Sequence, residues 1–169
     1  MYKRQSAIIG HGDAIVIPPQ SKQVELEAEL TIVIGKLAKN ISESEALDYV
    51  WGYTIANDVT ARDLQFNDGQ WARSKAFDTF CPLGPWIETE FLPESQVIES
   101  RINGDTRQHV SISKMTHNIR SIVSYVSKNF SLLPGDIILT GSPAGISVIA
   151  SGDVIECEIE GIGILANSV

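Results

Sequence analysis

The sequence contains only two cysteines among its 169 residues, Cys81 and Cys157. Neither lies in a C-x-x-C motif, the spacing that redox and zinc sites commonly use. The three histidines, His11, His109 and His117, also show no ligand spacing. We therefore expect two small buried thiols in a reducing compartment, with no disulfide. This predicts a cytoplasmic protein.

Long hydrophobic runs and an excess of basic residues are both absent. No apolar run approaches the ~20 residues that a membrane helix needs, and the amino terminus lacks the charged-then-apolar order of a signal peptide. Lysine and arginine together number 13 against 21 aspartates and glutamates, which gives a net charge of −8. A negative surface repels phosphate backbones and anionic lipids. We therefore expect neither nucleic-acid nor membrane partners.

Nothing in the sequence divides it into separate units, because it has no internal repeat and no linker rich in proline, glycine or serine. A chain of this size with 43% hydrophobic residues can bury a proper core. We therefore expect a single domain over residues 1–169. Met1 to Gln5 is polar and basic and meets the apolar Ala7 to Ile9 without a turn signal. We interpret this as a domain truncated at its amino terminus, with native sequence from about Ser6.

Strand signals outnumber helix signals and do not alternate with them. Asn103-Gly104 is the strongest short hairpin signal a sequence gives, and Asn118 to Asn129 carries apolar residues on one helical stripe. Ser42 with Glu45 resembles a capping box that opens a short helix through Val50. This order favours a mainly β fold, a mixed or antiparallel sheet folded on itself with few helices, over a doubly wound fold. The main expected strands are Val24–Ile34, Tyr53–Ala56, Val97–Ile102, Thr106–Val110, Ile137–Thr140 and Val154–Ile159.

Glu25, Glu27 and Glu29 alternate with hydrophobic residues, so they share one face of the expected strand Val24–Ile34. A charged strand face is usually solvated, and that interpretation stays open. However, the same face continues into Thr31, which suggests that it becomes buried as well. Buried carboxylates need a cation. The pattern therefore indicates either an exposed acidic strand or a cation site.

Side chains at positions i and i+2 of a strand can converge on one ion from the same side. A set of carboxylate oxygens suits Mg²⁺, Mn²⁺ or Ca²⁺ better than Zn²⁺. Asp58, next to Asn57 at the end of the expected strand Tyr53–Ala56, could supply a third carboxylate. An Asx turn explains Asp58 equally well.

The chain contains, in this order, ELEAELTIVIGK, DYVWGYTIANDVTARDLQ, WARSKAFDTFCPLGP, NGDTRQ, PGDIILTGSPAG and EIEGIGILAN. These stretches cover most of the sequence from Glu25 onward, and their combination is specific where any one would be weak. With them the chain strongly resembles the catalytic C-terminal domain of the fumarylacetoacetate hydrolase family. Within that family it is similar to the group of 2-hydroxyhepta-2,4-diene-1,7-dioate isomerases and acylpyruvate hydrolases.

The resemblance implies a rolled β-sandwich or barrel, usually a homodimer, that binds Mg²⁺ or another divalent ion. It matches the metal-binding carboxylates of the family to Glu27, Glu29 and Asp58. Glu25 is then an additional, exposed carboxylate. The implied substrate is a small 2-oxo acid.

Three further residues, Lys75, Arg62 and Gln65, match functional positions of the family, and Thr140 is a candidate because it follows an apolar strand and precedes a loop rich in glycine and proline. Lys75 matches the lysine that faces metal and substrate, where burial and the ion would disfavour its ammonium form. Its pattern alone would suit a surface lysine. Arg62 and Gln65 match substrate contacts, since a guanidinium can hold a carboxylate; without the resemblance they would be exposed helix residues. The hydroxyl of Thr140 could meet an anionic oxygen of the substrate or simply shape a turn.

The implied chemistry is chelation of a 2-oxo acid by the metal, a Lewis acid that stabilises an enolate. Lys75 would stabilise charge or carry a proton, and Arg62 with Gln65 would fix the distal end of the substrate. Hydrolysis of acylpyruvate or fumarylacetoacetate, isomerisation of a 2-hydroxy-dienoate and decarboxylation of oxaloacetate share that enolate. The hydrolases of the family use a His and Glu lid upstream of the acidic strand, and no such segment precedes Glu27. The alternative is therefore a non-catalytic metal-binding or dimerisation module, or an inactive fragment.

Overall fold

The computed structural model describes residues 3–169, in which strands predominate over helices. None of the helices in this range is long and apolar enough to cross a membrane. The helices are α1 (Arg62–Asp68), α2 (Ala72–Lys75) and α3 (Ile119–Asn129), with 3₁₀ turns η1 (Gln5–Ala7), η2 (Ala46–Tyr49) and η3 (Ile112–Lys114). The strands are β1 (Ile8–Ile9), β2 (Val24–Leu26), β3 (Ala28–Ile34), β4 (Val50–Asn57), β5 (Thr60–Ala61), β6 (Cys81–Glu88), β7 (Val97–Ile102), β8 (Asp105–Ser111), β9 (Ile137–Leu139), β10 (Ser147–Val148), β11 (Val154–Ile159) and β12 (Gly163–Ser168).

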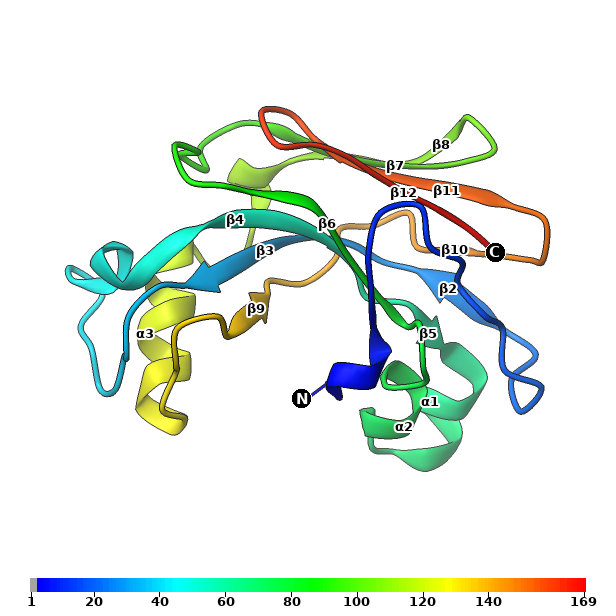
Figure 1. Cartoon of the computed structure of the whole chain (residues 1–169), viewed down its shortest axis with the longest axis horizontal. Helices are drawn as coiled ribbons and strands as arrows, with labels where there is room; N and C mark the ends of the chain where they lie inside the picture. Colours follow the sequence, from blue (N-terminus) through cyan, green and yellow to red (C-terminus); the bar gives the residue numbers. More distant parts are fainter. Residues whose placement is uncertain (1–2) are drawn as a thin grey trace.

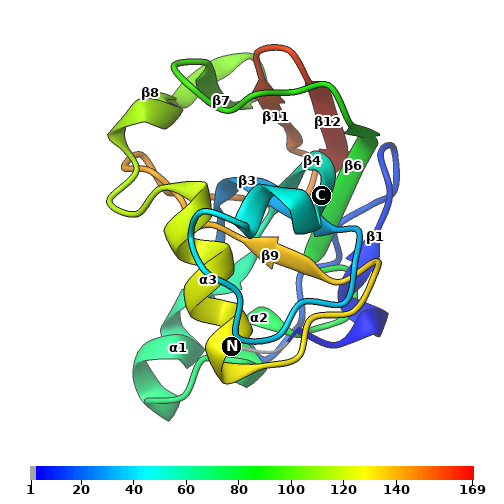
Figure 2. The ribbon, with the colours of Figure 1, turned by 90° about the vertical axis from the view of Figure 1, so that its left-hand side faces the viewer.

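The strands form three sheets (Figure 1). The first has the order β1-β6-β4-β3-β9, the second β10-β2-β5 and the third β12-β11-β7-β8. Neighbouring strands run antiparallel, except that β1 is parallel to β6. Figure 2 shows the third sheet above the first and the three α-helices on the opposite side. The prediction of a mixed sheet folded on itself with few helices is confirmed.

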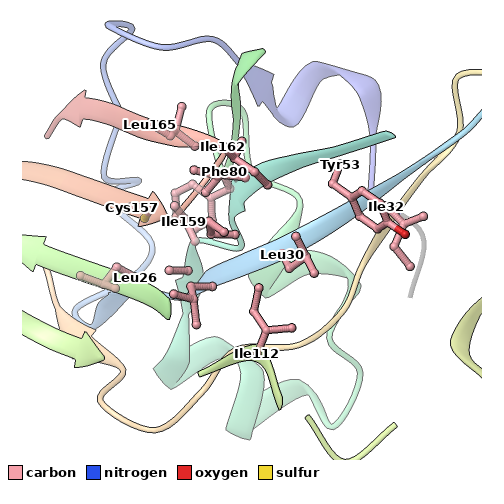
Figure 3. Close-up of a cluster of buried hydrophobic side chains, with 14 of the residues drawn as sticks. Leu26, Leu30, Ile32, Tyr53, Phe80, Ile112, Cys157, Ile159, Ile162 and Leu165 are labelled. Carbon is pink, nitrogen blue, oxygen red and sulfur yellow. The ribbon is translucent and has the colours of Figure 1, made fainter. Parts of the chain in front are cut away.

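The core forms where apolar side chains of the first and third sheets meet (Figure 3). Leu30 and Ile32 of β3 and Ile159 of β11 are each exposed by 2% or less. Cys157 lies in the same cluster, and burial raises the pKa of its thiol to about 12. Cys81 is also buried and free. The prediction of two small buried thiols is confirmed.

The hairpin and the long helix form where the sequence predicts them. β7 and β8 flank Asn103 and Gly104, whose φ angles of 53° and 84° are those of a tight hairpin turn. α3 begins after Asn118, whose side-chain oxygen accepts a hydrogen bond from the Ser121 N–H at 2.9 Å. Asparagine suits this position because it satisfies a free N–H group of the first turn.

The helix predicted from Ser42 to Val50 is wrong, because only the 3₁₀ turn η2 forms there. The Ser42 hydroxyl donates a hydrogen bond to Glu45 Oε2 at 2.6 Å instead of accepting one from a backbone N–H. Ala46 is buried, Tyr49 packs against the core, and β4 begins at the next residue. The chain therefore has room for a single turn before it enters the sheet.

The regular strand predicted from Val24 to Ile34 is divided in two at Glu27. β2 pairs with β5 and β10, whereas β3 pairs with β4 and β9. Glu27 therefore lies where the chain passes from the second sheet to the first. All residues of both strands are buried, which excludes the interpretation as an exposed acidic strand.

The loop after β9 approaches β8 so closely that only glycine fits at Gly145. This residue has a φ of +105°, and a Cβ atom there would lie 2.1 Å from the carbonyl oxygen of Arg107.

We predict that Gly145→Ala lowers the free energy of unfolding by roughly 3 kcal/mol or more, because the backbone must shift. Gly152→Ala is the matched control: its φ is +95°, but apart from the two neighbouring residues no atom of residues 3–169 would lie within 4 Å of the added Cβ atom. Gly152→Ala should lower the free energy of unfolding by only about 1 kcal/mol. Equal losses from the two variants in urea unfolding would contradict the close approach at Gly145.

Candidate metal centre

Two adjacent antiparallel strands bring three carboxylates together. β3 pairs with β4 so that Ala28 lies opposite Asn57, which places Asp58 beside Glu27. The Asp58 N–H donates to the Glu27 carbonyl oxygen at 2.8 Å, and Asn57 Oδ1 accepts from the Glu27 N–H at 2.9 Å. One carboxylate oxygen each from Glu27, Glu29 and Asp58 lies within 4.8 Å of the other two, and all three residues are buried. This group can hold a metal ion.

Lys75, the last residue of α2, lies between two of these carboxylates. Its Nζ is 2.8 Å from Glu27 Oε2 and 2.5 Å from Asp58 Oδ2. Burial disfavours the ammonium form, but the attraction of Asp58 and Glu27 outweighs it and raises the pKa of Lys75 above its ordinary value. The expectation of a disfavoured ammonium includes a bound ion, so it stays a prediction for the loaded centre. Without the ion, the two carboxylates within hydrogen-bond distance favour the ammonium form.

A second ammonium group, that of Lys3, reaches the other oxygen of Asp58. Lys3 Nζ is 2.5 Å from Asp58 Oδ1 and donates a hydrogen bond to the Phe80 carbonyl oxygen at 2.7 Å. Sequence reasoning missed this residue, because it interprets Met1 to Gln5 as preceding the native sequence. The parallel pairing of β1 with β6 carries the residues ahead of β1 to Phe80. No local sequence pattern indicates that pairing.

Arg62, the first residue of α1, donates hydrogen bonds to three side chains. Its Nε donates to Glu25 Oε2 at 2.6 Å, its Nη1 to Gln65 Oε1 at 2.5 Å and its Nη2 to Glu27 Oε1. Burial alone would lower the pKa of Arg62, but the bonds to Glu25 and Glu27 raise it. The expectation that Glu25 is exposed is wrong: it is only 8% exposed and also accepts a bond from Gln23. Glu25 can be buried because Arg62 neutralises it.

Glu29 forms no ion pair with any of residues 3–169, unlike Glu27 and Asp58. Its Oε2 accepts a hydrogen bond from the Gly141 N–H at 2.7 Å. Burial and then the charge of Asp58 raise the pKa of Glu29 to about 8, although Gly141 and Lys75 act in the opposite direction. A cation held by all three carboxylates would supply the counter-charge that Glu29 lacks. The donor set and this carboxyl group therefore fit a metal ion.

Thr140 lies beside the centre, and the bonds of its hydroxyl do not reach the three carboxylates. Its hydroxyl donates to the Leu30 carbonyl oxygen at 2.8 Å, while the next residue, Gly141, gives its N–H to Glu29. The loop after β9 thus contacts the centre through a backbone N–H group. Contact of Thr140 with a substrate stays a prediction. The structure brings together the other six residues singled out from the sequence: Glu27, Glu29, Asp58, Lys75, Arg62 and, through Arg62, Gln65.

All of residues 1–169 match the family described as fumarylacetoacetate (FAA) hydrolase C-terminal. The chain belongs to the fumarylacetoacetate hydrolase family. An uncharacterized protein of Methanocaldococcus jannaschii is 53% identical over 167 residues, which cover 99% of this chain and 70% of that protein. A mitochondrial oxaloacetate tautomerase of Xenopus laevis is 44% identical over 179 residues, which cover 99% of this chain and 56% of that protein.

Solved structures of the fumarylacetoacetate hydrolase family have the same architecture. A crystal structure of 2-hydroxyhepta-2,4-diene-1,7-dioate isomerase from Mycobacterium marinum is 47% identical and superposes with a TM-score of 0.98, covering 99% of this chain and 66% of that chain. The rolled β architecture implied by the resemblance is therefore confirmed. The chain spans about two thirds or less of the length of several curated relatives that it matches.

The raised pKa of Glu29 makes the stability of the metal-free chain depend on pH. Between the ordinary value of 4.5 and about 8, the folded state keeps a proton that the unfolded state has released. The free energy of unfolding therefore falls as the pH rises through this window, by up to about 5 kcal/mol, because each pKa unit corresponds to about 1.4 kcal/mol. Urea unfolding in the presence of EDTA should show the decline, and Glu29→Gln should flatten it.

Mg²⁺ should reverse this decline in the unmodified chain, because a ligand that binds only the folded state stabilises it. In titration calorimetry, Glu29→Gln should weaken Mg²⁺ binding roughly 10-fold or more. Glu25→Gln, outside the three-carboxylate group, should change it by less than about 3-fold. Equal losses from the two variants would show that Glu29 is not a ligand.

Proposed function

We propose that the chain is a divalent-metal-dependent enzyme that moves a proton on a small 2-oxo acid, with oxaloacetate or a 2-hydroxy-dienoate as the substrate class. The observation that carries the proposal is the position of Lys75. Lys75 is buried, with 5% of its surface exposed, and its ammonium group contacts two carboxylates of the candidate metal centre. A proton donor therefore lies next to the place where an oxygen-binding cation fits. The names of two relatives, an oxaloacetate tautomerase and a dienoate isomerase, support the same class of reaction.

Mg²⁺ is the proposed ion, with Mn²⁺ or Ca²⁺ as alternatives, because all three donors are carboxylate oxygens. Glu27, Glu29 and Asp58 would hold it. When bound, the ion supplies a Lewis acid that polarises the oxygens of a 2-oxo acid.

Lys75 carries the proton in this proposal. Glu27 and Asp58 favour its ammonium form and hold Nζ in place, at 2.8 Å and 2.5 Å. The ammonium group donates a proton to the 2-oxo oxygen of the substrate. The neutral amine then takes a proton from the neighbouring carbon. The keto form thus becomes the enol, and the lysine returns to its starting state.

Arg62 and Gln65 would bind the distal end of the substrate, where a guanidinium group can hold a carboxylate. The guanidinium group of Arg62 is held in place, because it donates hydrogen bonds to Glu25 and Gln65 at the edge of the centre. Thr140 would meet an anionic oxygen of the substrate by donating to it the hydroxyl hydrogen that it now gives to the Leu30 carbonyl oxygen.

Hydrolysis of a C–C bond is the second candidate, since hydrolases give the family its name. Hydrolysis needs a base that activates water. Two of the histidines lie in other contacts: His11 accepts a bond from Ala166 and His109 pairs with Glu99. Proton transfer uses groups that are already at the centre. We therefore favour tautomerisation or isomerisation over hydrolysis.

Lys75→Met tests the proposal directly. With Mg²⁺ present, the variant should lose at least roughly 100-fold in the keto–enol conversion of oxaloacetate, followed by ultraviolet absorbance, because the proton carrier is gone. Its Mg²⁺ affinity should stay equal or rise, since a neighbouring positive charge is removed. Lys36→Met, at an exposed lysine, is the control and should keep full activity.

Unchanged turnover in Lys75→Met would show that Lys75 has only a structural role, as the partner of an ion pair. Faster hydrolysis of acylpyruvate than conversion of oxaloacetate would favour the second candidate. Mg²⁺ binding by the unmodified chain without turnover of any 2-oxo acid would favour a non-catalytic metal-binding module.

We also propose a cytoplasmic homodimer. The two free cysteines support a reducing compartment. All three tryptophans, Trp51, Trp71 and Trp86, are more than half exposed, and large exposed aromatic side chains mark surfaces that associate. Sedimentation at micromolar concentration should give a dimer. A monomer under these conditions would contradict the proposal.

A further inference from the structure

Lys3 reaches the candidate metal centre from outside the elements that build it. The pairing of β1 with β6 sets Ile8 opposite Cys81, so the residues ahead of β1 lie near Phe80. Lys3 Nζ is 2.5 Å from Asp58 Oδ1 and donates to the Phe80 carbonyl oxygen at 2.7 Å. The side chain is only 12% exposed. Lys3 therefore lies within the centre and is not a surface lysine.

The three cations of the centre differ in how far their charge is already neutralised. Lys75 contacts two carboxylates, those of Glu27 and Asp58. Arg62 also contacts two, and each of its three nitrogens donates a hydrogen bond. Lys3 contacts one carboxylate, and its second bond goes to a neutral carbonyl group. Of the three, Lys3 is therefore the cation whose charge is least neutralised by neighbouring carboxylates, so it can interact most strongly with a further anion.

A charge count shows how Lys3 affects the loaded centre. Three cationic side chains meet four carboxylates there, which leaves a formal charge of −1; the carboxylates are those of Glu25, Glu27, Glu29 and Asp58. A divalent ion changes this charge to plus one. Without the charge of Lys3, the same loaded centre would be neutral. Only the positive centre attracts an anion over a distance.

We propose that Lys3 is an anion-binding residue of this centre, whose ammonium group gives the metal-loaded site the positive charge that attracts the carboxylate of a 2-oxo acid. The inference rests on the proposed function, because it concerns the same centre and the same class of substrate. It has two opposite consequences. Lys3 assists the binding of an anion and opposes the binding of a cation, since its charge lies close to both.

Titration calorimetry separates these two effects, first with Mg²⁺ alone and then with oxalate added to the Mg²⁺-saturated chain. Lys3→Met should weaken oxalate binding roughly 10-fold or more and leave Mg²⁺ affinity equal or higher. Lys3→Gln keeps a hydrogen-bond donor for Phe80 but loses the charge, so it should behave like Lys3→Met. Lys3→Arg keeps the charge and should retain most of the oxalate affinity. Lys39→Met, at an exposed lysine, is the control.

Loss of both Mg²⁺ and oxalate binding in Lys3→Met would overturn the inference, because Lys3 would then only support Asp58. Full oxalate affinity in Lys3→Gln would overturn it as well, since the hydrogen bond and not the charge would matter. High salt should narrow the difference in oxalate affinity between the unmodified chain and Lys3→Met, because ions screen charge attraction.

Failure of the proposed function gives a different result. The unmodified chain would then bind no Mg²⁺, or it would bind Mg²⁺ and oxalate without converting any 2-oxo acid. If the unmodified chain binds both Mg²⁺ and oxalate and the Lys3 variants bind them with the same affinities, only the anion-binding role of Lys3 is contradicted.

Discussion

Carboxylates buried side by side on one strand face are the constraint on which the rest of the centre depends. An isolated charge in a protein interior costs several kcal/mol, so each carboxylate needs a cation or a proton. The fold supplies cations from three directions: Arg62 from α1, Lys75 from α2 and Lys3 from the segment ahead of β1. Among residues 3–169, Glu29 receives a backbone N–H but no ion pair, so burial and the charge of Asp58 raise its pKa. The elements around β3 are therefore arranged by charge as much as by apolar packing.

The two short helices depend on the same charges. α1 has seven residues and α2 has four, whereas isolated helices shorter than about 12 residues are marginal in water. Arg62 at the start of α1 and Lys75 at the end of α2 both bond to buried carboxylates of the sheet. These bonds anchor the helices where propensity alone would not. Order in this region and the charge state of the centre are therefore coupled.

Local patterns predict the parts of the fold that depend on neighbouring residues. The turn at Asn103 and the cap at Asn118 are examples, because each is decided within a few positions. The helix expected at Ser42 is limited to one turn because β4 begins at Val50, earlier than the strand that the local pattern predicts from Tyr53. Strand alternation indicates Glu27 and Glu29, the end of an expected strand indicates Asp58, and the family resemblance indicates all three.

The remaining features of the centre depend on partners far away in the sequence. The burial of Glu25 follows from Arg62, 37 positions later, and the role of Lys3 follows from Asp58, 55 positions later. The ammonium form of Lys75 is likewise favoured by Asp58 and Glu27, 17 and 48 positions earlier. A periodic pattern shows which face a residue shares but not which charge will oppose it. Such pairs become visible only when the sheets have been placed.

The bonds that complete the centre have a consequence for when it can form. The contact of Lys3 with Phe80 spans 77 positions, and that of Gly141 with Glu29 spans 112. Contacts between such distant segments form late, because the loops between them must close first. During synthesis the centre cannot be complete until Gly141 has been added and the chain ahead of β1 has found its place beside β6. A metal ion held by the three carboxylates would thus mark a chain in which the segments around Lys3 and Gly141 have both reached their native positions.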